Sequence, residues 1–205
     1  MKHRSLLFLI PLIALFACNR NRVTITGVVE EGARTKISLE RLDVSRTTVI
    51  DTVLTGRDGS FTFTTRIDEP HLMLLRNDNG EILNLLPFPG DRISVTTTCG
   101  TFGTGYRVGG SPESEKIRSL VEHLHHTRTT IDSLVTVADS VSCPDDPRLA
   151  LARTAFRQAL VDQKRYTIRF IVENMKSLSS IYALYQKFDD ENFILAEESD
   201  LQYYK

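Results

Sequence analysis

The sequence predicts an α+β fold, in which an N-terminal antiparallel β-sandwich or open barrel is followed by a C-terminal helical hairpin with one or two further helices. From residue 23 to residue 109, apolar and polar residues alternate, and turn residues recur every ten or so positions. This pattern is typical of short antiparallel strands. From residue 110 to residue 205 the apolar residues are spaced by three and four, which is typical of amphipathic helices. We therefore expect a β-domain at 23–109 and a helical region at 110–205.

The first 17 residues have the composition of an export signal. Met1-Lys2-His3-Arg4 is basic, and residues 6–16 form an apolar run broken only by Pro11. A membrane-spanning helix needs about 20 apolar residues, so this run is too short to stay in a bilayer. It fits the hydrophobic region of a secretory signal. We predict that residues 1–17 are a signal peptide.

Leu15-Phe16-Ala17-Cys18 resembles the lipobox of bacterial lipoproteins. The small Ala17 suits the signal peptidase, and the thiol of Cys18 is the group that accepts diacylglycerol. We predict that Cys18 is lipidated and that residues 18–22 form a polar tether. The predicted location is the cell envelope, with the anchor in the outer membrane and the protein facing the periplasm. A secreted protein with a chance cysteine is the alternative.

The first expected strands are bounded by turn residues. Residues 23–28 alternate, and residues 36–42 place Ile37 and Leu39 on one face. The turn Arg57-Asp58-Gly59-Ser60 is strong because glycine adopts positive φ without a steric penalty. Residues 47–65 are therefore predicted to form a β-hairpin.

Three further strands complete the predicted β-domain. A turn at residues 77–80 separates strands at 72–75 and 82–86. Pro87-Phe88-Pro89-Gly90-Asp91 then turns the chain into a strand at 93–96, since proline and glycine suit the central positions of such a turn.

The helical region begins at Ser111-Pro112. We expect Ser111 to cap the helix with its side chain, and proline suits the first helical position. Asp146-Pro147 repeats this arrangement. Two helices of about 25–30 residues joined by a short loop are predicted to pack as an antiparallel hairpin. The pattern predicts a shorter helix at residues 179–188 and the start of another helix at residues 199–205.

Charge and cysteine content exclude some functions. The chain has 25 basic and 26 acidic residues and no basic patch, so nucleic acid is not an expected partner. Cys99 and Cys143 lie 44 positions apart in predicted loops. In an oxidising compartment they could form a disulfide, and two separate free thiols are the alternative. The chain has no C-x-x-C motif, so we do not expect redox catalysis from it.

One histidine cluster offers candidate metal ligands. His123 and His126 share a helix face at i, i+3, as zinc ligands can, but no motif supplies the third and fourth ligands that a site needs. A solvated polar stretch of helix is the favoured interpretation. We predict no bound metal, no cofactor and no catalytic residue.

The order of six motifs resembles a known family. The motifs follow the lipobox in the order V-T-I-T-G-V (23–28), K-I-S-L-E (36–40), I-D-T (50–52), D-G-S-F-T-F (58–63), P-G-D-R-I-S-V (89–95) and G-G-S-P-E-S-E (109–115). In this order the sequence is similar to the family described as domain of unknown function 4369. The resemblance covers residues 18–205. In that family, the β-rich module commonly precedes a helical stretch and a thioredoxin-like thiol-disulfide oxidoreductase domain.

The resemblance implies a lipid-anchored, non-catalytic N-terminal accessory module of a periplasmic thiol-disulfide oxidoreductase. The family's active site is a C-x-x-C that this sequence lacks, so no catalytic residue carries over. We expect the chain to stop before a thioredoxin-like domain; a natural C-terminus is the alternative. The expected partners are the membrane, through the lipid, and a downstream thioredoxin-like domain or an envelope protein. The competing hypotheses are a stand-alone envelope lipoprotein with a binding or structural role and a metal hydrolase that uses the histidines.

Overall fold

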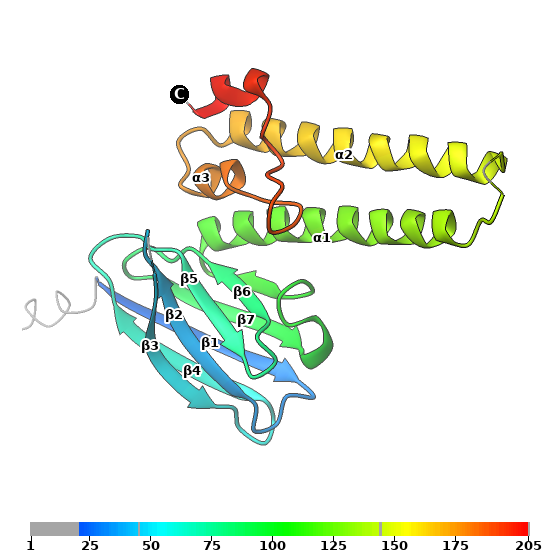
Figure 1. The fold of residues 1–205 in the computed structure, drawn as a ribbon. Helices are drawn as coiled ribbons and strands as arrows, with labels where there is room; N and C mark the ends of the chain where they lie inside the picture. The colour runs from blue at the N-terminus through cyan, green and yellow to red at the C-terminus, as the bar shows by residue number, and fades with distance from the viewer. Residues whose placement is uncertain (1–20, 45, 144, 205) are drawn as a thin grey trace, which may run out of the picture.

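The computed structural model describes residues 21–44, 46–143 and 145–204 (Figure 1). In this part of the chain, two four-stranded sheets are followed by helices, so the fold is α+β. The predicted signal peptide, Cys18 and most of the tether lie outside the described residues.

The first sheet has the strand order β4-β1-β7-β8. Its strands span Ser60–Arg66 (β4), Arg22–Glu30 (β1), Arg92–Thr98 (β7) and Arg107–Gly109 (β8). Its three longer strands alternate between buried apolar residues and more exposed residues, most of them threonine, serine or arginine. One face of this sheet therefore belongs to the core, and the other lies at the surface.

The second sheet has the order β3-β2-β5-β6, and all its neighbouring strands are antiparallel. Its strands span Thr47–Leu54 (β3), Lys36–Leu42 (β2), Met73–Asn77 (β5) and Ile82–Leu85 (β6). The predicted turn at residues 77–80 joins β5 to β6, and Gly80 adopts a φ of 81° there.

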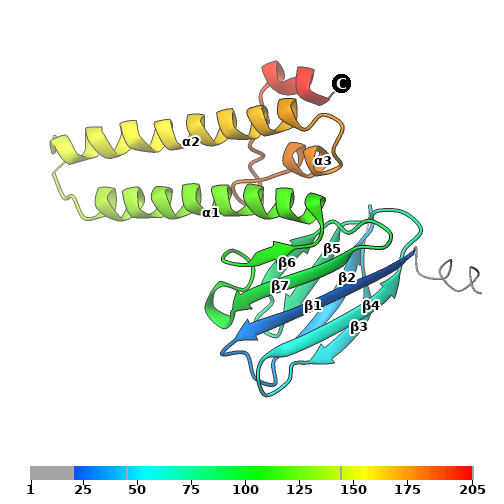
Figure 2. The same ribbon diagram turned by 180° about the vertical axis from the view of Figure 1, so that it is seen from behind.

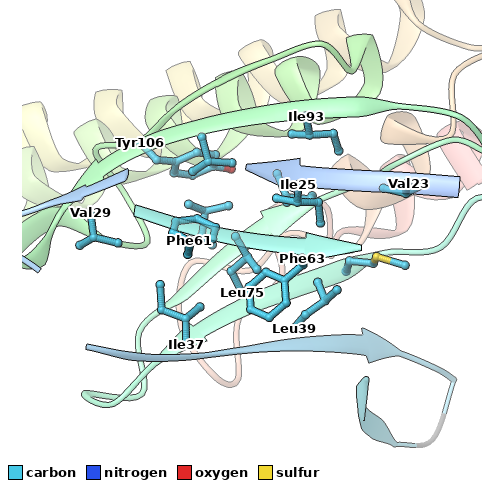
Figure 3. Packing of buried hydrophobic residues seen from close by; sticks show 14 of the residues in the cluster. Val23, Ile25, Val29, Ile37, Leu39, Phe61, Phe63, Leu75, Ile93 and Tyr106 are labelled. Atoms are coloured by element: carbon cyan, nitrogen blue, oxygen red, sulfur yellow. The ribbon is translucent and has the colours of Figure 1, made fainter. Parts of the chain in front are cut away.

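One hydrophobic cluster joins the two sheets (Figure 3). Ile25 and Phe63 from the first sheet pack with Ile37, Leu39 and Leu75 from the second, and all five side chains are essentially inaccessible to solvent. Burial of such side chains contributes roughly 1.5–3 kcal/mol each relative to exposure. The β-domain therefore has its own core.

Two details of the predicted β-domain are wrong. The strands predicted as a hairpin over residues 47–65 do not pair, because β3 pairs with β2 and β4 pairs with β1. The turn between them crosses from one sheet to the other. The sheets are also not wholly antiparallel: β1 and β7 are parallel, with Ile25 opposite Ile93. Between β1 and β7 the chain passes through β4 and through all four strands of the second sheet. β7 then runs in the same direction as β1.

The helices follow the predicted boundaries closely. Helix α1 spans Pro112–Asp139 and α2 spans Pro147–Glu173; they lie side by side and run in opposite directions (Figures 1 and 2). The third helix, α3, spans only Ser179–Leu184 because residues 186–194 turn back and pair. The C-terminal element, η3, is a 3₁₀ helix over Glu198–Tyr204.

The two predicted N-caps behave differently. Asp146 caps α2 as expected, since its carboxylate accepts a hydrogen bond from the Arg148 amide at 2.8 Å. Ser111 does not cap α1 with its side chain. Its buried hydroxyl donates instead to the carbonyl of Leu86, just after β6. The first turn of α1 is thus bonded to the second sheet, a connection that the Ser114 hydroxyl reinforces by accepting from the Leu86 amide at 3.0 Å.

A second hydrophobic cluster lies among the helices and the segment that follows them. It comprises the buried residues Leu120, Leu124, Ile171, Ala183, Ile194 and Leu195. Within the described ranges, no helix combines the length and apolar character that crossing a membrane requires.

Candidate functional site: a cleft between the second sheet and the helices

A cleft of about 1360 Å³ separates the outer side of the second sheet from α1 and α3. Its walls come from the end of β2, from β6, from the loop before β8, from α1 and from α3 with the residues that follow it. The side chains that line it include Leu42, Ile82, Leu124, Ile181, Tyr182, Tyr185 and Gln186.

Apolar side chains at the mouth of this cleft are unusually exposed. Tyr185 and Ile181 have exposed fractions of 63% and 52%, and Leu42 opposite them has 42%. Isolated exposed apolar residues are normal, but a contiguous group around a concavity is typical of a binding surface. The cleft is therefore the strongest candidate binding site among the described residues.

Two polar groups in the cleft have unused hydrogen-bonding capacity. Gln186 is only 5% exposed, and its buried Oε1 atom has no hydrogen-bond partner in the structure. An unsatisfied buried polar atom costs roughly 1–3 kcal/mol. Tyr182 lies one helical turn before it. Burial raises the pKa of Tyr182 to about 12, so its hydroxyl remains a neutral donor at physiological pH.

The helical wall of the cleft is held firmly. The Arg128 side chain on α1 donates from Nε to the Phe188 carbonyl at 2.7 Å and from Nη2 to the Lys187 carbonyl at 2.8 Å. The ammonium group of Lys187 in turn lies 4.6 Å from the centre of the Phe193 ring. These contacts hold the segment after α3 against α1.

Glu113 ties the start of α3 to the start of α1. Its carboxylate accepts hydrogen bonds from the Ser177 hydroxyl at 2.6 Å and the Ser179 amide at 2.9 Å, and pairs with Lys116. Burial by itself raises the pKa of Glu113, but these hydrogen bonds outweigh it and hold the pKa below its ordinary value. The ionised carboxylate is therefore the form that positions α3.

Comparison with known proteins identifies the N-terminal part of the chain. Residues 23–117 match the family model described as domain of unknown function 4369. Residues 23–117 are a DUF4369 domain. The match begins in β1 and continues past β8 into the first two turns of α1, which agrees with the bonding of Ser111 and Ser114 to the second sheet.

Other comparisons add little to the DUF4369 assignment. No curated protein matches the chain. Among solved structures, a 9R-lipoxygenase from Cyanothece PCC8801 is similar over 75% of this chain and 31% of its own, at 10% identity and a TM-score of 0.26. A similarity of that size carries no argument about fold or function.

The predicted metal-ligand candidates lie just beyond the DUF4369 domain and do not converge on a site. The ring of His123 stacks on Tyr166 with 3.6 Å between centroids, and its Nδ1 atom lies 2.8 Å from Oε1 of Gln163. His126 is exposed. Over the described ranges, no group of three or more potential ligands is close enough to hold a metal ion. His123 instead contributes to the packing of α1 against α2.

The two cysteines are both free and belong to different parts of the chain. Cys99 begins the 3₁₀ turn η2 (Cys99–Thr101) after β7, where its thiol donates to the carbonyl of Glu31 at 3.4 Å. Cys143 is exposed in the loop between α1 and α2, at the end of the helices that projects away from the DUF4369 domain (Figure 1). In the structure both thiols are free.

Sequence reasoning did not find the cleft. Ile181 and Tyr185 have a helical spacing of four, which predicts a buried helix face just as well as an exposed one. The buried acceptor of Gln186 has no sequence signature. The exposure of these side chains depends on which elements pack against α3, and only the tertiary structure reveals this.

Proposed function

We propose that the chain is a lipid-anchored, non-catalytic accessory module of a periplasmic thiol-disulfide oxidoreductase, and that the cleft is where the module binds its partner. The partner is a thioredoxin-like domain, on the same polypeptide or on another. In this proposal the two sheets form one β-sandwich, α1 and α2 form a helical hairpin, and the cleft lies between them.

The observation that carries the proposal is the chemistry of the cleft. Its lining is mostly apolar, with charged side chains such as Glu81, Lys187 and Asp190 beside the apolar ones, and it includes the Gln186 amide and the neutral Tyr182 phenol. A peptide unit presents an N–H donor and a C=O acceptor and so matches this pair. An amide and an un-ionised phenol suit recognition better than catalysis, since neither is a ready nucleophile or general base. An extended apolar segment of a protein partner is the ligand that this arrangement favours.

Two further observations support the placement in the envelope. The DUF4369 domain begins five residues after Cys18, the cysteine of the lipobox-like motif. The resemblance on which the proposal draws places such modules ahead of a thioredoxin-like domain. A lipid anchor would hold both at the membrane surface.

A photo-crosslinking amino acid at Ile181 tests the proposal in cells. Ile181 lies at the mouth of the cleft, and a crosslink to a thioredoxin-like domain with a C-x-x-C motif is the expected product. Leu151 is the matched control, because it is 70% exposed on α2 and does not line the cleft. No such crosslink from Ile181, or equal yields from both positions, would contradict the proposal.

A stand-alone envelope lipoprotein is the second candidate, and the same cleft favours it. The crosslinking experiment separates the two. Crosslinks from Ile181 only to envelope proteins that lack a C-x-x-C motif would support the stand-alone role.

A further inference from the structure

The outer face of the first sheet carries hydroxyl groups and arginines. Along β1, β4 and β7 the residues that alternate with the buried apolar ones are almost all threonine, serine or arginine. In these three strands, the one carboxylate at an outward position is Glu30, at the far end of β1. None of the helices α1, α2 and α3 covers this face, which is seen directly in Figure 2. The sheet therefore presents a polar, positively charged surface.

Three arginines cluster at the end of this face where β1 begins. Arg22 lies directly opposite Arg66 across the β1–β4 pair, and Arg92 lies opposite Thr24 across the β1–β7 pair. Like charges directly opposite each other in a sheet are destabilising. Among the residues that the structure describes, the neighbouring carboxylates do not form ion pairs with these two arginines.

Those neighbouring carboxylates are engaged elsewhere. Asp68 accepts a hydrogen bond from the Asn21 side chain at 2.7 Å, and Asp91 accepts one from the Phe88 amide at 3.0 Å. Glu69 is exposed and lies 3.8 Å from His71. No carboxylate among the described residues forms an ion pair with the three arginines. Their guanidinium groups are therefore available to an external anion.

A shallow groove of about 400 Å³ runs along the same face between β1 and β7. Arg22 and Arg92 line it together with the hydroxyls of Thr24, Thr26 and Ser94. The Thr26 and Ser94 hydroxyls donate to the carbonyls of Ile93 and Gly109, whereas the guanidinium groups and the Thr24 hydroxyl are donors that suit phosphate oxygens. The groove therefore fits an anionic headgroup better than a neutral or cationic one.

The position of this cluster relative to the anchor indicates the source of the anion. Arg22 lies four positions after Cys18, a span of at most about 14 Å when fully extended. A lipid on Cys18 would therefore hold the arginine end of the sheet at the bilayer surface. We propose that the outer face of the first sheet docks on anionic phospholipid headgroups, with Arg22, Arg66 and Arg92 as the main contacts. This inference rests on the proposed lipid anchor and adds an orientation to it.

Vesicle co-sedimentation tests the docking without the lipid. Every described helix and strand follows residue 21, so a chain that begins at Cys18 and carries Cys18→Ser keeps the whole fold. We expect it to bind vesicles of phosphatidylcholine and phosphatidylglycerol, to bind vesicles of pure phosphatidylcholine far more weakly, and to lose binding as salt rises.

Two triple variants with the same net charge locate the contact. Arg22→Gln/Arg66→Gln/Arg92→Gln should weaken binding to the anionic vesicles on the order of 100-fold, since each arginine near an anionic surface is worth roughly fivefold. Arg153→Gln/Arg157→Gln/Arg169→Gln removes three exposed arginines from α2 and should retain most of the binding. Equal loss in the two variants, or equal binding to both kinds of vesicle, would overturn the proposal.

A fluorescent reporter gives a second reading that does not depend on affinity alone. The chain has no tryptophan, so Thr62→Trp on the outer face of β4 provides a single reporter. Its emission should shift to the blue with anionic vesicles, whereas that of Leu151→Trp on α2 should not. Failure of the anchor itself would appear separately, as an unlipidated Cys18 in the native protein, and would leave these vesicle results unchanged.

Discussion

Gly59 lies in the turn between β3 and β4 with a φ of 76°, and its carbonyl accepts a hydrogen bond from the Val29 amide at 3.0 Å. A Cβ atom there would overlap the Val29 carbonyl. Gly80 has nearly the same φ, 81°, but open space around it. Alanine substitutions at the two glycines therefore distinguish the energetic cost of backbone strain alone from the added cost of steric overlap.

We predict that Gly80→Ala lowers the free energy of unfolding by about 1–2 kcal/mol, the cost of the left-handed conformation. Gly59→Ala should lower it by more than twice as much, because β1 must also move. Urea denaturation measures both values. Equal losses would show that the turn does not press against β1.

Glu113 gives a prediction about pH. Its pKa in the folded protein lies below the ordinary value of 4.5, so the ionised form stabilises the fold. This contribution is fully present at neutral pH and is lost as the pH falls from about 4.5 through the lowered pKa. Glu113→Gln should reduce the free energy of unfolding at pH 7 by about 1–3 kcal/mol, and the difference from the unmodified chain should shrink below pH 4.5.

Glu115→Gln is the matched control for that measurement. Glu115 lies in the same first turn of α1, but its side chain is exposed and makes no hydrogen bond or ion pair in the structure. Its replacement should change stability by less than about 0.5 kcal/mol. A difference between Glu113→Gln and the unmodified chain that is constant with pH would contradict the assigned role of the carboxylate.

Single residues differ in how well the sequence predicts them. The turn role of Gly59 and the capping role of Asp146 depend on neighbours within a few positions, and both were predicted correctly. The role of Glu113 depends on Ser177 and Ser179, which are 64 and 66 positions away. Such a contact has no local pattern to reveal it.

At the level of elements, α1 and α2 are joined by a buried polar cluster as well as by apolar packing. Oε1 of Gln163, a fully buried residue, lies 2.8 Å from both His123 Nδ1 and Thr127 Oγ1. Its amide nitrogen donates to Thr167 on the next turn of α2. A cluster of this kind favours one register of the two helices over others.

Replacing the Gln163 amide should destabilise the packing of α1 against α2 in this register. Gln163→Leu keeps the size of the side chain but leaves Nδ1 of His123 without its partner and Thr127 with only the His123 carbonyl as acceptor. We therefore expect a loss of about 1–3 kcal/mol in the free energy of unfolding. Gln158→Leu, on the exposed side of α2, should change it by no more than about 0.5 kcal/mol. Thermal unfolding of the two variants is the measurement, and an equally stable Gln163→Leu would refute the role of the cluster.

Most elements could be predicted from periodicity, but their pairing could not. The period-two pattern located the longer strands, and the spacing of three and four located α1 and α2. The hairpin prediction at residues 47–65 was wrong because the turn residues indicate where a chain reverses, and not which sheet the next strand joins. The parallel pairing of β1 with β7 also depends on strands that are far apart in sequence.

At the scale of the molecule, the two candidate surfaces belong to different sheets. The arginines lie on the outer face of the first sheet, whereas Ile82 and Asn84, which alternate with the buried Leu83 and Leu85 of β6, line the cleft on the second. A membrane under the first sheet would therefore leave the cleft open toward the periplasm. The order of motifs predicted the DUF4369 domain from sequence, but this arrangement required the fold.

The central claim is that Cys18 carries a lipid, and mass spectrometry of the protein purified from membranes tests it most directly. We predict that the mature chain begins at Cys18 with a diacylglyceryl thioether, and that Cys18→Ser abolishes the lipid whereas Cys143→Ser does not. A mature protein that retains residues 1–17, or one that starts near residue 18 with an unmodified thiol, would contradict the account.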